Sequence, residues 1–86
     1  MNVRFTVSAR RHDVSLRDAA AALAGAVVTV TALDGEDDKW LALGFDTAGR
    51  LLELVGYDLD GGAVLVVHAM KCRASYYRLI TGGDSK

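Results

Sequence analysis

The chain has 86 residues and a formal net charge of −1; 51% of its residues are hydrophobic, 24% are charged and none is proline. Because domains usually contain about 100–150 residues, this length leaves room for one small domain and excludes two. The high apolar content and low net charge exclude intrinsic disorder, and the absence of proline excludes collagen-like and proline-rich sequences. We therefore expect a single domain over residues 1–86, in which residues 82–86 form a flexible, solvated tail.

Three features of the sequence bear on where in the cell the protein is located. The longest charge-free apolar stretch, residues 19–33, is interrupted by threonines and is too short for a membrane-spanning helix, which needs about 20 apolar residues. No apolar segment of the secretory type follows the N-terminal arginines. The single cysteine, Cys72, cannot form an internal disulfide. These features predict a cytoplasmic protein without membrane association.

The first third of the chain predicts a strand, a helix and a second strand. Residues 3–7 alternate apolar and polar side chains, as in a short half-buried strand. Ser15 is a favourable helix N-cap, apolar residues recur after it at helical spacing, and Gly25 suits the C-terminal end. Residues 27–33 are rich in β-branched side chains and predict a strand.

The remainder predicts an antiparallel meander followed by a helix. Apolar segments alternate with turn sequences rich in aspartate and glycine, and the Asp60-Gly61 pair is a strong hairpin signal. We expect strands over residues 40–45, 51–57 and 63–70, and a short helix over residues 73–80. The predicted fold class is α+β: an N-terminal helix, an antiparallel meander sheet of three or four strands, and a short C-terminal helix.

Known metal and nucleotide motifs are missing from the sequence. His12, His68 and Cys72 do not have the spacing of zinc ligands, and the acidic segment 34–38 lacks the closing glutamate of a calcium loop. No glycine-rich phosphate-binding motif occurs. We therefore expect neither a metal nor a cofactor.

The residues that favour chemistry lie at the start of one predicted strand and the end of the next. If Tyr57 pairs with Ala63 across the hairpin, Arg50 lies near Met70 and one end of the sheet gathers five functional side chains: Arg50, Glu53, His68, Lys71 and Arg73. Arginine makes bidentate contacts with phosphate and stabilises developing negative charge, while histidine moves protons near neutral pH. This set therefore favours chemistry on a phosphodiester.

His68 also suits a purely structural role. Strict alternation along the predicted strand places it on the same face as Val64, Val66 and Met70. An imidazole on an apolar face is the pattern of a hydrogen-bonded core histidine.

The other candidates have structural interpretations too. Arg50 follows a turn glycine and suits a solvated position, and Glu53 suits a surface ion pair of small energetic value. Tyr76 suits packing under the last helix, and His12 suits a partial cap of the first helix. Trp40 suits either the core or a surface that faces a partner.

Several segments resemble BrnT-like toxins. Residues 11–15 (RHDVS), followed by an alanine-leucine helix, are similar to the R/K-H-G-V-S opening of that family, with Asp13 in place of its glycine. Residues 48–53 (AGRLLE) and 67–73 (VHAMKCR) are similar to segments of its actinobacterial members. The likeness covers about residues 10–80.

This resemblance implies a single domain with the fold of the RelE/ParE superfamily. It implies the toxin half of a type II toxin–antitoxin pair, a cytoplasmic endoribonuclease that needs no metal or cofactor and stops translation and growth. The implied partners are a protein antitoxin encoded by a neighbouring gene and RNA, including mRNA on the ribosome.

By motif, the resemblance places five residues at positions that the family uses: Arg50, His68, Lys71, Arg73 and Tyr76. The hypothesis of an RNA-cleaving toxin then assigns roles to single residues. His68 is the expected general acid or base, Arg50 and Arg73 hold the phosphate, and Glu53 serves as the base if His68 is buried. The expected RNA contacts are Lys71, Tyr76, Arg78 and His12. Two alternatives stay open: a non-enzymatic module that binds a partner through Trp40, the acidic segment or a sheet edge, and a ParE-like toxin whose target is not RNA.

Overall fold

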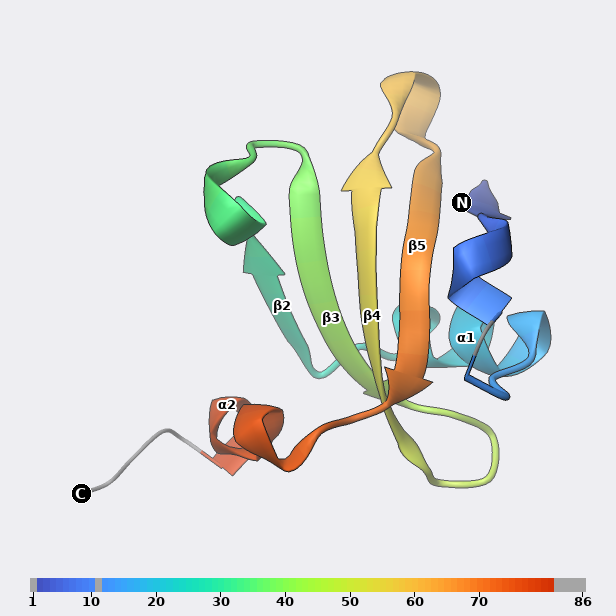
Figure 1. The fold of residues 1–86 in the computed structure, drawn as a ribbon, viewed down its shortest axis with the longest axis vertical. Coiled ribbons are helices and arrows are strands. Elements are labelled where there is room, and N and C mark those ends of the chain that lie inside the picture. The colour runs from blue at the N-terminus through green and yellow to red at the C-terminus, as the bar shows by residue number, and fades with distance from the viewer. Residues whose placement is uncertain (1, 11, 82–86) are drawn as a thin grey trace.

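A computed structural model describes residues 2–10 and 12–81 and has an α+β architecture (Figure 1). Its strands and α-helices are, in chain order, β1 (Val3–Phe5), α1 (Leu16–Ala24), β2 (Val28–Thr31), β3 (Lys39–Phe45), β4 (Leu51–Asp58), β5 (Val64–Lys71) and α2 (Tyr77–Thr81). None of the helices in these two ranges has the length and apolar character to cross a membrane. The predicted tail at 82–86 lies outside the described residues.

The strands form one five-stranded mixed sheet in the order β1-β5-β4-β3-β2. Strands β2 to β5 are antiparallel neighbours, whereas β1 runs parallel to β5, with Val3 opposite Val64 and Phe5 opposite Val66. The α+β class is therefore confirmed, but the expected antiparallel sheet of three or four strands is wrong. The alternation of residues 3–5 marks a strand without indicating its neighbour or direction, because these depend on which edge of the meander is free.

Helix α1 begins and ends where the sequence predicts. The Ser15 hydroxyl accepts a hydrogen bond of 3.0 Å from the backbone N–H of Asp18, and the helix ends at Gly25. Its buried residues, Ala19 and Ala22, pack against the face of the sheet that β3 and β4 present to α1. We call this the α1 face; its buried residues are Trp40, Ala42, Leu52, Leu54, Val66 and Ala69. Trp40 therefore belongs to the core.

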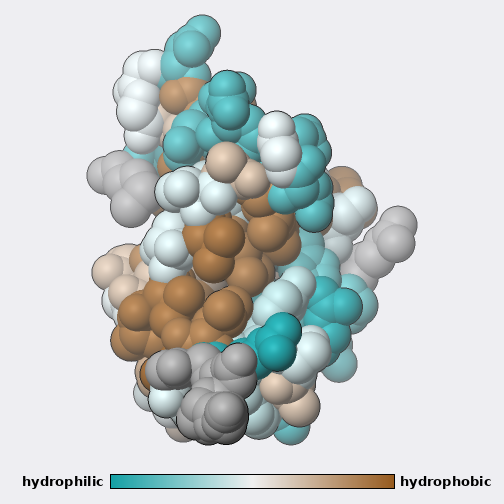
Figure 2. All heavy atoms as spheres, turned by 90° about the vertical axis from the view of Figure 1, so that its left-hand side faces the viewer, coloured by the Kyte–Doolittle hydropathy of each residue, from teal (hydrophilic) through white to brown (hydrophobic). Residues whose placement is uncertain are grey.

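The opposite face of the sheet, which we call the open face, carries a smaller cluster. Leu41 and Leu43 are buried there, as their alternation with Trp40 and Ala42 predicts. Partly buried residues pack around them: Val28, Val30, Leu33, Leu51, Val55 and Tyr76. Figure 2, which views the molecule from the side of β2 and α2, shows apolar residues gathered between hydrophilic regions.

Candidate functional site

A β-bulge in β5 places His68 on the open face. The pairing of β5 with β4 skips Val67, so the alternation of side chains reverses at that residue. Val64 and Val66 pack on the α1 face, whereas the His68 side chain points the other way and keeps 28% of its exposure. The predicted common face of His68 with Val64 and Val66 is therefore wrong, whereas Met70, which stands opposite Glu53, shares the open face with His68.

The hairpin register also differs from the predicted one. Tyr57 pairs with Leu65 instead of Ala63, because the loop is centred on Gly61, which adopts a φ of 79°. The offset from the predicted register is two residues up to Gly56 and three beyond the bulge, so Glu53 stands opposite Met70 instead of Val67. The two-residue offset preserves the faces, whereas the extra residue at the bulge reverses them.

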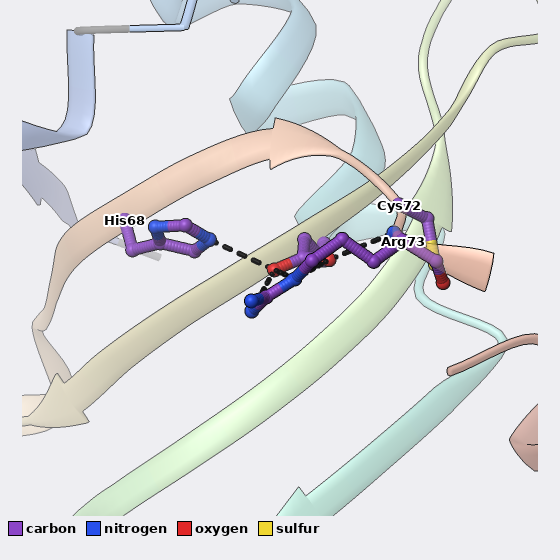
Figure 3. A network of polar contacts seen from close by, with 4 residues as sticks. His68, Cys72 and Arg73 are labelled. Atoms are coloured by element: carbon purple, nitrogen blue, oxygen red, sulfur yellow. Dashed lines mark hydrogen bonds and ion pairs between the residues drawn. The ribbon is translucent and has the colours of Figure 1, made fainter. Parts of the chain in front are cut away.

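Glu53 is a fully buried carboxylate in the middle of β4. Its neighbours Leu52 and Leu54 lie on the α1 face, so Glu53 points to the open face, where its side chain has no solvent exposure. His68 Nε2 lies 2.9 Å from Oε2 of Glu53. Arg73 donates its backbone N–H to Oε1 at 2.9 Å and its Nε and Nη2 to the carboxylate at distances between 2.8 and 3.1 Å (Figure 3). Both carboxylate oxygens are therefore engaged, as a buried charge requires.

These contacts set the charge of Glu53. Burial by itself would raise the pKa of Glu53, but the hydrogen bonds from Arg73 and the one from His68 outweigh burial and hold this pKa below its ordinary value of 4.5. Glu53 is therefore ionised at neutral pH. An ionised acceptor beside Nε2 favours the tautomer with hydrogen on Nε2 and leaves the lone pair on Nδ1 of His68.

Arg73 connects this buried network to solvent. Its side chain is 54% exposed, and its guanidinium carbon lies 5.3 Å from the centre of the Tyr76 ring, a cation–π contact. Nη1 of Arg73 is not used in the contacts with Glu53. Residues 73–80 were expected to form one helix; instead Arg73 is extended, a 3-10 turn covers residues 74–76, and α2 begins at Tyr77. Arg73 precedes the helical turn, and its backbone N–H, which would have no acceptor inside a helix beginning there, donates to Glu53.

An open groove of about 360 Å³ lies beside the network. Its lining contains six polar or charged residues, namely Asp34, Lys39, Tyr57, His68, Arg73 and Tyr76, together with Leu33, Val55 and Val67. Lys39 Nζ lies 2.9 Å from Asp34 Oδ2, and this hydrogen bond raises the pKa of Lys39. The groove therefore presents an imidazole and two cations together with an exposed carboxylate.

Sequence reasoning missed Lys39 and Tyr57 as groove residues. They stand directly opposite each other in the β3–β4 pairing, and the Lys39 ammonium lies 5.9 Å from the centre of the Tyr57 ring. The turn at residues 46–49 fixes this register. If Phe45 and Leu51 are paired across that turn, each further pair follows, and Lys39 falls opposite Tyr57.

Comparison with known proteins found no match: no protein-family model, no curated protein and no solved structure matches this chain. The resemblance to BrnT-like toxins therefore stays a prediction. Within residues 2–10 and 12–81, no three His, Cys, Asp or Glu side chains are grouped so that they could hold a metal ion.

The structure separates Arg50 from the other cluster residues. Arg50 Nε donates a 2.8 Å hydrogen bond to Asp46, and its Nη2 lies 3.8 Å from Asp18 of α1. Burial would raise the pKa of Asp46, but hydrogen bonds from Arg50 and Ala48 outweigh it and lower this pKa. The predicted placement of Arg50 near Met70 is wrong, because Met70 pairs with Glu53, three residues further along the chain, while Arg50 closes the turn at Asp46.

The expected RNA contacts do not gather in one place. The pairing of β5 with β4 assigns Lys71 to the α1 face, and Arg78 is exposed on α2; neither residue lines the groove. Tyr76 does line it, and the ring of His12 lies 5.7 Å, centre to centre, from the ring of His68. Of the five residues expected to cluster, the structure brings together Glu53, His68 and Arg73.

This arrangement suits proton transfer on an anionic substrate. The imidazole is fixed by a buried carboxylate, and the guanidinium of Arg73 contacts the same carboxylate through Nε and Nη2, so that Nη1 takes no part in this contact. A held imidazole accepts or donates a proton near neutral pH, and a guanidinium stabilises negative charge that develops beside it.

Proposed function

We propose that this chain is the toxin half of a type II toxin–antitoxin pair and that it cleaves RNA in the groove beside His68. The observation that carries the proposal is the imidazole of His68, held by the buried Glu53 carboxylate at the edge of a groove that also presents Arg73. The resemblance to BrnT-like toxins gives additional support. Asp13 adopts a φ of 58°, in the left-handed region that favours the glycine which that family carries at this position.

The proposed reaction is attack of a ribose 2′-hydroxyl on the adjacent phosphorus. Nδ1 of His68 accepts the hydroxyl proton as the new phosphorus–oxygen bond forms, and the bond to the 5′-oxygen breaks as that oxygen takes a proton. The products are a 2′,3′-cyclic phosphate and a 5′-hydroxyl. Nη1 of Arg73 stabilises the charge on the non-bridging oxygens, and Glu53, which no solvent reaches, acts as a positioning residue for both side chains.

The charge of the groove has a consequence for RNA affinity. Asp34 and Glu53 offset the charges of Lys39 and Arg73, so the groove itself supplies little non-specific attraction for phosphates. We therefore expect weak binding of free RNA that weakens further with salt, and we propose that mRNA held on the ribosome is the better substrate.

The proposal includes a cytoplasmic protein antitoxin as the partner. Phe45, Tyr77, Leu79 and Ile80 are exposed apolar residues, and an apolar hollow of about 220 Å³ lies between β3, β4 and α2. Exposed apolar patches on small domains mark protein contacts. A partner that covers this hollow stands next to the end of the open face that carries Arg73.

Expression in a bacterial host and cleavage of labelled RNA in vitro test the proposal together. We expect growth arrest, and RNA products that end in a 2′,3′-cyclic phosphate, formed at low ionic strength and in the presence of a chelator. His68→Ala should lower the cleavage rate about 10²–10⁴-fold, which is the contribution of one general acid–base group. Thermal unfolding of the variant serves as the control for folding.

The other outcomes point to the alternatives. A chain that neither arrests growth nor cleaves RNA, free or on the ribosome, overturns the proposal and favours a non-enzymatic interaction module. Growth arrest with intact RNA favours a toxin that acts on a different target. Cleavage by His68→Ala at the wild-type rate removes His68 from the mechanism.

A further inference from the structure

The chain contains two histidines, and their rings are neighbours. The ring centres of His12 and His68 are 5.7 Å apart, with an angle of 66° between the ring planes. His12 is exposed and His68 is partly exposed. Both imidazoles are therefore open to solvent at one place on the surface.

The fold creates this pair through the short first strand. Strand β1 pairs with only the first three residues of β5, and the 3-10 turn Val7–Arg10 that follows packs beside β5. The chain then passes His12 and reverses at Asp13, in the left-handed conformation, before α1 begins. The bulge at Val67 turns His68 off the α1 face. Two irregular features of the backbone thus bring the histidines together.

We infer that His12 is a second catalytic residue, the general acid that protonates the leaving 5′-oxygen. The inference rests on the proposed function and adds a residue to it. Attack by the 2′-oxygen and departure of the 5′-oxygen occur on opposite sides of phosphorus, so one imidazole cannot serve both oxygens at once. Two neighbouring imidazoles can divide the two proton transfers.

The surroundings of each ring assign the two roles. Nε2 of His68 is bound to the ionised Glu53, so Nδ1 holds a lone pair and suits the base. In the described part of the chain, no carboxylate accepts a hydrogen bond from His12, and its exposure lets it take up a proton from water. His12 gives that proton to the 5′-oxygen, and His68 returns the 2′-hydroxyl proton to solvent, so the proton balance closes over one turnover.

A change of leaving group tests this assignment. The test substrate is an RNA dinucleotide in which sulfur replaces the bridging 5′-oxygen. When the phosphorus–sulfur bond breaks, the second nucleoside leaves as a stable thiolate, so this step needs no general acid. On the ordinary substrate, His12→Ala should lower the cleavage rate about 10²–10⁴-fold. On the sulfur substrate, the same variant should approach the wild-type rate, whereas His68→Ala should stay slow on both. Ser8→Ala, an exposed substitution in the neighbouring turn, is the matched control and should leave both rates unchanged.

The outcomes separate this inference from the proposed function. Equal losses for His12→Ala on both substrates make His12 a positioning residue and overturn its role as the acid, as does a wild-type rate on both. In these cases the wild-type protein still cleaves RNA, so the proposed function survives. If the wild-type protein cleaves neither substrate, the proposed function fails and the role of His12 falls with it. His12→Gln repeats the test with a side chain that keeps hydrogen bonding.

Discussion

The Nε2 atom of His68 lies 2.9 Å from Oε2 of Glu53, a carboxylate with no solvent exposure. Glu53 is in β4, the central strand of the sheet, whereas His68 lines the groove. The interaction therefore couples the interior to the site: the buried charge is stable only while His68 and Arg73 satisfy it, and the imidazole is oriented only while the charge remains.

We expect Glu53→Gln to lower the free energy of unfolding by about 2–3 kcal/mol, the value of hydrogen bonds to a charged group. The amide keeps the volume of the side chain but loses the charge that Arg73 and His68 both contact. Arg73 is 54% exposed and recovers part of its solvation, which limits the loss. Urea denaturation at pH 7 measures the effect.

Glu36→Gln is the matched control for this substitution. Its carboxylate also pairs with a cation, Lys39, at 3.4 Å, but the Glu36 side chain is 52% exposed. A surface pair of this kind contributes at most about 0.5–1 kcal/mol. Equal losses in the two variants would contradict the assignment of Glu53 as a buried anchor.

The stability of the fold should fall in acid, and Glu53 should contribute to the fall. The pKa of Glu53 is lower in the folded chain than its ordinary value of 4.5, so the unfolded chain binds more protons in the interval between the two. Its stabilising contribution is complete above that interval and is lost as the pH drops through the pKa of the folded state. Asp46, whose pKa is also lowered, acts in the same direction.

The variant Glu53→Gln isolates the contribution of Glu53 to this pH dependence. The difference in unfolding free energy between wild type and variant should be largest at pH 7 and should narrow as the pH is lowered through 4.5, the ordinary pKa, and below it. Urea titrations over this pH series measure the difference. A constant gap across the series would show that the titration of Glu53 is not linked to folding.

Local signals in the sequence were sufficient to predict helix α1 and the four antiparallel strands β2 to β5. Ser15 and Gly25 mark the ends of α1 because capping depends only on residues next to the cap. The pairing of β1 with β5 and the bulge at Val67 depend on contacts between distant segments, and alternation alone reveals neither. The bulge is what brings His68 to Glu53, because without it His68 would lie on the α1 face with Val66.

Close packing of α1 on the sheet predicts that Gly44 tolerates no side chain. A Cβ atom at Gly44 would collide with the backbone carbonyl of Ala22 and lie 3.2 Å from Cα of Ala26. Because these are backbone atoms of the packed helix α1 and of the segment that directly follows it, we expect Gly44→Ala to cost about 3 kcal/mol of stability through overpacking. Gly25→Ala is the control, since its Cβ would meet only the Ala21 carbonyl at 3.6 Å. Thermal unfolding should show a change within about 1 kcal/mol for the control; a similarly small change for Gly44→Ala would disprove the close contact.

Two arginine variants separate a role in the groove from a role in a turn. Arg73→Ala removes the cation beside His68, and we expect the cleavage rate to fall about 10²–10³-fold, as for loss of one donor that stabilises the transition state. Arg17→Ala is the control: it removes an exposed positive charge on α1, away from the groove, and should leave the cleavage rate unchanged.

Arg50→Ala removes the side-chain partner of Asp46 but leaves the backbone N–H groups that donate to the same carboxylate, so we expect only a modest loss of stability. Because Arg50 is bound to Asp46 and Asp18 and does not line the groove, its effect on cleavage should be at least about tenfold smaller than that of Arg73→Ala. The comparison requires initial rates measured at a temperature where both variants are folded. Equal losses of cleavage would place Arg50 beside the phosphate, as the sequence pattern predicts, and would mean that RNA binding releases Arg50 from the turn.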